Sequence, residues 1–210
     1  MKLKILTALA ALIVGTAHAG VSTSLLQSAP VKEPGQYEAK AHLDFIARSE
    51  TTTFPKSGVL FTPHLQFGLL EHYLDMDAYI GTGVTDFQAG TTLKYNLLPD
   101  IENQAALSFL AGVGVLYDQV GYENIVSGLI TTGAIVSKQF NVVEFGSWSP
   151  YAALQIEVLT NKIESVLPVN LAIGSQLHVA ETAPWNYYGE ISLSLRRSFF
   201  SLSLGAGYPF

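Results

Sequence analysis

Charged and imidazole side chains alternate with apolar residues in several segments of this sequence. Asp75 and Asp77 lie two positions apart, which on an extended strand places both carboxylates on one face, roughly 6–7 Å from each other. Such a pair could share a proton or bind a cation. The side chains predicted to face a common interior on the same grounds are Lys40, His42, Asp44, Asp75, Asp77, Lys94, Glu157, His178, Glu190 and Arg196.

These residues do not form a known catalytic or metal-binding motif. Neither GxSxG nor HExxH occurs, and the spacing of the histidines is not that of metal ligands. In a confined interior, charges are tolerated when they are paired. We therefore expect ion pairs across the interior, with no catalytic residue, no cofactor and no bound metal.

The elements that must position these side chains are β-strands. Around residues 36–45, Tyr37 and Phe45 belong to an apolar set at odd positions, whereas Lys40 and Asp44 belong to a polar set at even positions. Similar segments recur to the C-terminus. Ten strands are predicted at residues 36–45, 59–70, 72–80, 87–95, 105–117, 125–137, 151–160, 166–179, 187–196 and 201–210. Eight strands remain possible, because Pro63 weakens the second and the sixth alternates too poorly to assign its faces.

The N-terminus has the three parts of a secretory signal peptide. Lys2 and Lys4 precede an apolar run at residues 5–14, and small residues end it at Ala17 and Ala19. We expect cleavage before Gly20, so that residues 1–19 are the signal peptide. Residues 20–35, which include Pro30 and Pro34, are predicted to be a loose periplasmic lead-in, and residues 36–210 the strand domain.

The composition indicates a membrane protein without membrane-spanning helices. The chain is 49% hydrophobic and only 13% charged, against about 25% charged residues in soluble domains. The longest uncharged run after the signal peptide, residues 165–180, contains Pro168 and Gly174. The other backbone that satisfies its own hydrogen bonds in lipid is a closed β-barrel. The predicted fold is an all-β, closed, antiparallel, up-and-down transmembrane barrel in the outer membrane of a Gram-negative bacterium.

The charge and cysteine content exclude other classes. A net charge of −6 argues against a nucleic-acid partner, which needs a basic surface. The absence of cysteine rules out a disulfide scaffold and a thiolate metal site.

Aromatic residues gather beside the turns expected at the periplasmic end of the barrel. Aromatic girdles at the boundary between lipid and water are typical of such barrels. The predicted girdle consists of Tyr37, Tyr73, Tyr95, Trp148, Tyr151, Trp185, Tyr187, Tyr208 and Phe210.

The sequence ends SLSLGAGYPF, a strand pattern that stops on an aromatic residue. Ser203, Gly205, Tyr208 and Phe210 resemble the C-terminal β-signal of outer-membrane barrels. The resemblance implies that the barrel-assembly machinery recognises this strand, and that it closes the barrel against the first strand. It also implies contact with outer-membrane lipid and lipopolysaccharide. As a pattern, the chain resembles the small barrels of the opacity-protein and OmpA type.

The function expected from these features is a structural or surface-interaction role, with a polar lumen filled by side chains. About eight strands leave an interior that side chains can fill, whereas porins need about 16. Three alternatives remain. The protein could be an outer-membrane enzyme acting on lipid A or peptides, a narrow pore, or a soluble periplasmic lipid-binding barrel with its apolar residues turned inward.

Overall fold

The computed structural model describes residues 25–48, 57–120, 122–142, 146–162, 165–179, 184–195 and 199–210. Within these residues, no helix has the length and apolar character needed to span a membrane. The strands are β1 (Tyr37–Arg48), β2 (Gly58–Leu70), β3 (Leu74–Gly83), β4 (Phe87–Leu98), β5 (Ala106–Val120), β6 (Glu123–Ser137), β7 (Phe140–Val142), β8 (Gly146–Thr160), β9 (Ser165–Val166), β10 (Val169–Val179), β11 (Trp185–Ser194) and β12 (Phe199–Pro209).

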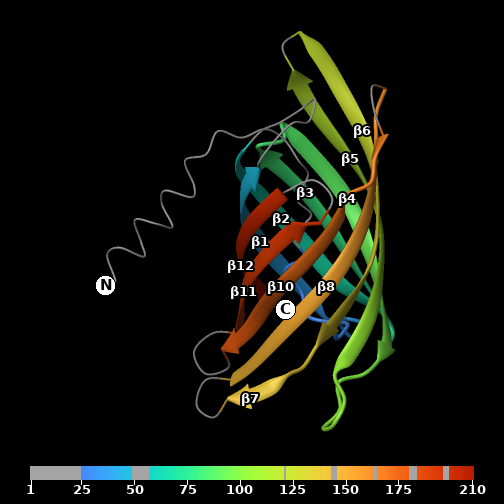
Figure 1. Ribbon diagram of the computed structural model, residues 1–210. Coiled ribbons are helices and arrows are strands. Elements are labelled where there is room, and N and C mark those ends of the chain that lie inside the picture. Colours follow the sequence, from blue (N-terminus) through green and yellow to red (C-terminus); the bar gives the residue numbers. More distant parts are fainter. Residues whose placement is uncertain are drawn as a thin grey trace, which may run out of the picture.

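Ten long strands form a closed antiparallel barrel (Figure 1). Each pairs with the next long strand along the chain, and β12 pairs with β1 to close the ring. The short strands β7 and β9 lie outside this ring and pair only with β8. The prediction of a ten-stranded, up-and-down, all-β barrel is therefore confirmed.

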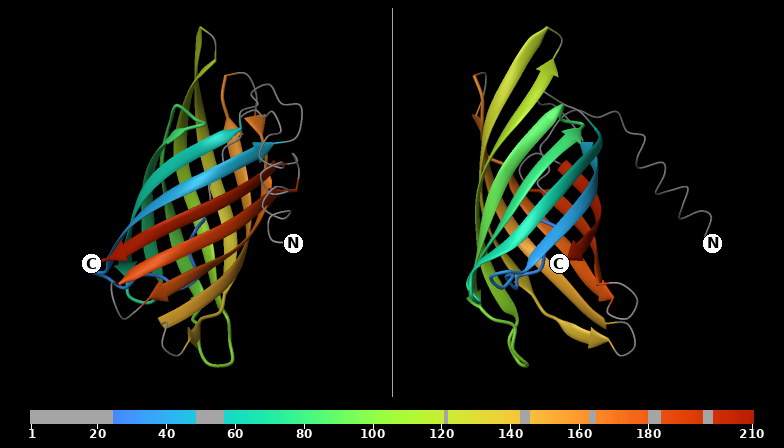
Figure 2. Two further views of the ribbon diagram at one scale, coloured as in Figure 1. Left: turned by 90° about the vertical axis from the view of Figure 1, so that its left-hand side faces the viewer. Right: turned by 180° about the vertical axis from the view of Figure 1, so that it is seen from behind.

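The two ends of the barrel differ (Figure 2). Tyr37, at the start of β1, lies beside Phe210 at one end, which we call the C-terminal rim. The hairpin of β5 and β6 extends beyond the other end, the distal rim. Its strands remain paired up to the contact of Val120 with Glu123.

The two faces of each strand follow the expected pleat. Along β1, Glu38, Lys40 and His42 are buried inside the barrel, whereas Leu43 and Phe45 are exposed on the outside. In β6, whose faces the sequence left unassigned, the inward set mixes apolar residues such as Leu129 and Ile135 with Ser127, Thr131 and Ser137, and the outward set includes Ile130 and Val136.

Proline changes the pairing of β2 without ending the strand. Pro63 lies opposite Ala41 of β1. On the other side of β2, the pairing with β3 passes from Phe61 to His64 and omits the two residues between them. Because proline has no amide hydrogen, a local loss of ladder pairing is expected at this position.

The segment before β1 is not a loose lead-in. Residues 25–33, here called the inner segment, lie inside the barrel, where Leu25, Leu26, Gln27 and Ala29 are at most 5% exposed. A turn at Gly35, with a φ of 84°, connects the inner segment to β1 at the C-terminal rim. Residues 1–24 lie outside the described residues, so the signal peptide and its cleavage site stay predictions.

Candidate functional site in the barrel lumen

The lumen has an apolar wall and a charged wall, and the inner segment lies between them. Strands β5, β6, β8 and β10 supply the apolar wall, a buried cluster in which Leu25 and Ala29 of the inner segment take part. The wall residues of this cluster are Ala106, Leu110, Ile135, Tyr151, Ala153 and Ala172. Most of the predicted charged residues lie on β1, β3 and β4. Most of the charged residues therefore lie on one wall, although buried polar side chains such as Ser137, Gln155 and Glu157 also line the wall that carries the apolar cluster.

Glu190 on β11 holds the beginning of the inner segment. Its carboxylate accepts hydrogen bonds from the backbone N–H of Leu25 at 3.2 Å and of Leu26 at 3.0 Å. Leu26 has a positive φ of 35°. A left-handed residue lets successive N–H groups converge on one anion, as in backbone anion-binding nests. Glu190 is thus satisfied mainly by backbone groups.

Tyr151 completes the hydrogen bonding of Glu190 and corrects a prediction. The sequence placed Tyr151 in the outer aromatic girdle, but its side chain is 3% exposed and its hydroxyl donates to Glu190 at 2.8 Å. The pleat gives the reason. Trp148, three positions earlier on β8, points outward, so Tyr151 points into the lumen.

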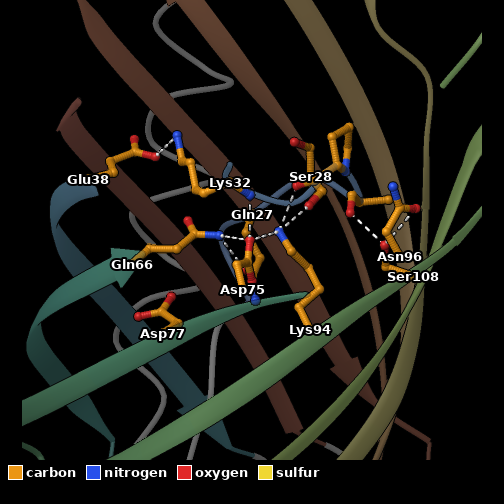
Figure 3. Close-up of polar contacts among 12 residues, drawn as sticks. Gln27, Ser28, Lys32, Glu38, Gln66, Asp75, Asp77, Lys94, Asn96 and Ser108 are labelled. Atoms are coloured by element: carbon orange, nitrogen blue, oxygen red, sulfur yellow. Dashed lines mark hydrogen bonds and ion pairs between the residues drawn. The ribbon is translucent and has the colours of Figure 1, made fainter. Parts of the chain in front are cut away.

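The middle of the inner segment is held through its backbone. The N–H of Ala29 donates to the hydroxyl of Ser137 at 3.0 Å, and the Ala29 carbonyl accepts from Ser108 at 2.6 Å. Lys94 on β4 donates to the carbonyls of Ser28 at 3.1 Å and Pro30 at 2.9 Å (Figure 3). Ser28 also donates from its hydroxyl to Gln176 at 2.8 Å.

Lys32, near the end of the inner segment, makes two contacts with the charged wall. Its backbone N–H donates to Asp75 at 3.0 Å. Its ammonium group pairs with Glu38 at 2.7 Å, as Figure 3 shows. The inner segment is therefore bound at its beginning, its middle and its end.

Asp75 and Asp77 each pair with a different lysine. Lys40 lies 2.9 Å from Asp77, and Lys94 lies 3.3 Å from Asp75. Gln66 donates to Asp75 at 2.7 Å and accepts from Lys40 at 3.0 Å, which links the two pairs. These contacts join β1, β2, β3 and β4. The predicted pairing across the lumen is wrong for these pairs, because the inner segment occupies the space between opposite walls.

A second polar group, around Glu38, was not among the predicted interior residues. The Glu38 carboxylate accepts hydrogen bonds from Tyr188 and, at 2.6 Å, from Asn186 of β11. His178 lies 2.8 Å from the amide oxygen of Asn186. The alternation of β1 places Glu38 on the same face as Lys40, so this signal was present in the sequence.

Of the remaining predicted residues, three lie in the part of the lumen toward the distal rim, and one is not among the described residues. His42 is fully buried, and its ring centroid lies 4.2 Å from that of His64. Asp44 and Glu157 are each 1% exposed. Arg196 lies outside the described residues. Every described member of the predicted set is on the inner face, although His178 is only half-buried.

The space left in the lumen is small. A cavity of about 30 Å³ is lined by Leu25 and Gln27 of the inner segment and by wall residues that include His64, Asp77 and Tyr79. A single water needs about 10–15 Å³ by this kind of measure, so the cavity has room for about two. This cavity therefore has room for water and not for a larger solute.

A group of three ionisable side chains that could hold a metal ion lies outside the lumen, at the C-terminal rim. His72, Glu33 and Glu71 bring potential ligand atoms within 4.8 Å of one another. His72 Nδ1 lies 2.6 Å from Glu33, and the side chains of His72 and Glu71 are well exposed. His72 and Glu33 contact each other, which makes this group an exposed contact between the inner segment and the turn after β2.

The outside of the barrel is apolar. Ile173, Val113, Ile130, Leu204 and Ile191 are between 47% and 62% exposed. Toward the C-terminal rim lie aromatic contacts, with Trp185 against Tyr208 at 5.3 Å and Tyr73 against Tyr95 at 6.4 Å between ring centroids. Exposed apolar surface this extensive is unfavourable in water and matches the lipid-facing band of membrane barrels.

No protein-family model matches the chain, and no curated protein matches it. Among solved structures, the chain is similar to the translocator domain of the autotransporter NalP from Neisseria meningitidis. The identity is 12% and the TM-score 0.42, covering 100% of this chain and 96% of that one. It is also similar to a de novo designed transmembrane β-barrel, with 14% identity and a TM-score of 0.36, covering 86% and 99%. Likenesses this distant concern the fold at most.

Proposed function

We propose that this protein is a small integral barrel of the Gram-negative outer membrane whose lumen is closed, and that it serves a structural or surface-interaction role in the envelope. The observation that carries the proposal is the occupied lumen. The inner segment and the ion pairs of Lys40 and Lys94 fill the half of the lumen next to the C-terminal rim. The cavity beside them measures about 30 Å³. A barrel of this kind joins the two faces of a membrane without passing solutes.

The apolar exterior favours a membrane location over a soluble lipid carrier. A soluble lipid-binding barrel turns its apolar residues toward the ligand in its lumen. Here Leu204 and Ile173 point outward, whereas the lumen contains Lys40 and Asp77, both almost fully buried. The outer membrane in particular is supported by the signal-peptide pattern at residues 1–19 and by Ser203, Gly205, Tyr208 and Phe210 in the C-terminal strand.

The same features support a place among the small barrels of the opacity-protein and OmpA type. In this proposal, the barrel-assembly machinery inserts the protein, and outer-membrane lipid with lipopolysaccharide surrounds it. The engagement of Asp75 and Asp77 by separate lysines does not favour a catalytic carboxylate dyad.

Electrophoresis of the membrane-extracted protein, with and without boiling, tests the membrane location. We expect the protein in the outer-membrane fraction. On the gel, the unboiled barrel should migrate differently from the boiled chain, because the ring of hydrogen-bonded strands is closed. Recovery from the soluble periplasmic fraction would contradict the proposal and favour the lipid-binding alternative.

A further inference from the structure

The walls of the lumen contact the inner segment chiefly through its backbone. Wall carboxylates and hydroxyls accept from four main-chain amides, and wall donors reach three successive main-chain carbonyls. The amides are those of Leu25, Leu26, Ala29 and Lys32, and the carbonyls are those of Ser28, Ala29 and Pro30. Backbone groups are common to every polypeptide, so these contacts suit a chain that adopts the same irregular backbone shape, with a left-handed residue at the position of Leu26.

The inner segment has little structure of its own. No helix or strand is assigned to residues 25–33, and the hydrogen bonds that satisfy its backbone come from the barrel. Buried backbone amides and carbonyls need such partners, and in this segment the wall supplies them. Glu190, Asp75 and Lys94 therefore act toward the inner segment as a receptor acts toward a bound peptide.

The apolar wall adds a side-chain requirement. Ala29 is fully buried in the cluster with Ala106, Ile135 and Ala172, so a larger side chain at this position would overpack the site. Leu25 enters the same cluster four residues earlier. The site consequently favours a chain of this backbone shape with a small residue at the position of Ala29 and an apolar residue four positions before it.

We propose that the lumen is a binding site for a short polypeptide of this class, that residues 25–33 are its resident occupant, and that a peptide supplied from outside can replace them. The occupant joins the barrel at a single place, the exposed turn of Pro34, Gly35 and Gln36. Separation at this turn would convert the intramolecular occupant into a ligand that can dissociate.

The test uses the full chain with a protease site inserted at Gly35. After reconstitution and cleavage, electrophoresis without boiling reports whether the barrel is still closed. The released fragment is washed out, and a fluorescent peptide of residues 25–34 is titrated while its anisotropy is measured. We expect saturable binding to the cleaved barrel and none to the uncleaved one, whose site is occupied.

Three controls connect binding to the proposed contacts. A peptide of scrambled sequence should bind at least tenfold more weakly, and so should a peptide with Ala29→Phe. The barrel with Glu190→Gln should lose affinity for the unchanged peptide by a similar factor. The substitution replaces one of the two carboxylate oxygens that accept from the amides of Leu25 and Leu26 with an NH₂ group, which donates.

Specific outcomes would overturn the proposal. One is equal binding of the scrambled and unchanged peptides to a folded, cleaved barrel. Another is a cleaved fragment that excess peptide cannot exchange. A third is loss of the folded migration on cleavage, which would make the inner segment an integral part of the fold and exclude an exchangeable ligand.

Discussion

Tyr37 and Phe210, the first and last residues of the barrel, are direct partners. The N–H of Tyr37 donates to the carbonyl of Phe210 at 3.2 Å, and the N–H of Phe210 donates to the carbonyl of Tyr37 at 3.0 Å. Their rings stack with 5.7 Å between centroids. Tyr37 and Phe210 therefore form the last pair of the seam between β1 and β12, and their rings lie together at the C-terminal rim.

Deletion of Phe210 should impair assembly more than stability. The deletion removes one pair at the rim of a long seam, but it also removes the residue that ends the β-signal pattern. We expect the variant to accumulate unassembled in the periplasm, as measured by membrane fractionation and unboiled electrophoresis. Phe200→Ala, which removes another outward ring of β12, is the matched control and should assemble. Normal membrane levels of the deletion variant would contradict the prediction.

A charge on the outer face should destabilise the barrel. Leu204 lies near the middle of β12 and is 51% exposed on the outside. Arginine near the bilayer midplane costs about 2–4 kcal/mol in membrane barrels. Leu204→Arg should lower the free energy of unfolding by this amount in urea titrations in lipid vesicles. Leu204→Ala, which adds no charge, should cost less, and equal effects of the two variants would argue against a lipid-facing position.

Glu190→Gln should loosen the beginning of the inner segment. Glutamine keeps the size of the side chain but offers one acceptor oxygen where the carboxylate offers two. A buried amide left without a partner costs about 1–3 kcal/mol. Hydrogen exchange at the amides of Leu25 and Leu26 should therefore accelerate by about tenfold to a hundredfold. The exposed Glu71→Gln serves as the control, and unchanged protection in Glu190→Gln would show that the carboxylate does not hold the segment.

Lys94 and Asp75 should be energetically coupled. Both side chains are almost fully buried, and Lys94 also donates to two carbonyls of the inner segment. Removal of one member of a buried ion pair costs about 3–5 kcal/mol, because the other charge is left without its partner. Lys94→Met should thus cost several kcal/mol, and Lys94→Met with Asp75→Asn less than the sum of the single variants. Additive costs in this double-mutant cycle would contradict the pairing.

The strands and most of their faces were predictable from alternation. In β1, four polar side chains at even positions are enough to assign the inner face, and the structure confirms it. In β6, the inner face carries Leu129 and Ile135 as well as Ser127, Thr131 and Ser137, and Ile135 belongs to the apolar cluster. Apolar residues therefore occur on both faces of this strand, and alternation gave no assignment.

The sequence predicted a lumen filled by side chains but not the inner segment inside it, because this segment has no periodicity to reveal its position. Its backbone is ordered by groups more than 40 residues away in sequence, such as Asp75 and Glu190. One signal for an additional hydrogen-bond donor was present in the sequence, because the carboxylates of the predicted interior outnumber its lysines and arginine. Glu190 accepts hydrogen bonds from backbone amides and from Tyr151, which a count of charged side chains does not include.

Conductance across planar lipid bilayers tests most directly the central claim that the lumen is closed. The purified wild-type protein should give no stable open channel, because the inner segment and the ion pairs of Lys40 and Lys94 fill the half of the lumen next to the C-terminal rim. Glu190→Gln and Lys94→Met should give small or flickering currents as the inner segment loosens. Stable conductance of nanosiemens size from the wild-type protein would contradict a closed lumen and make the protein a pore.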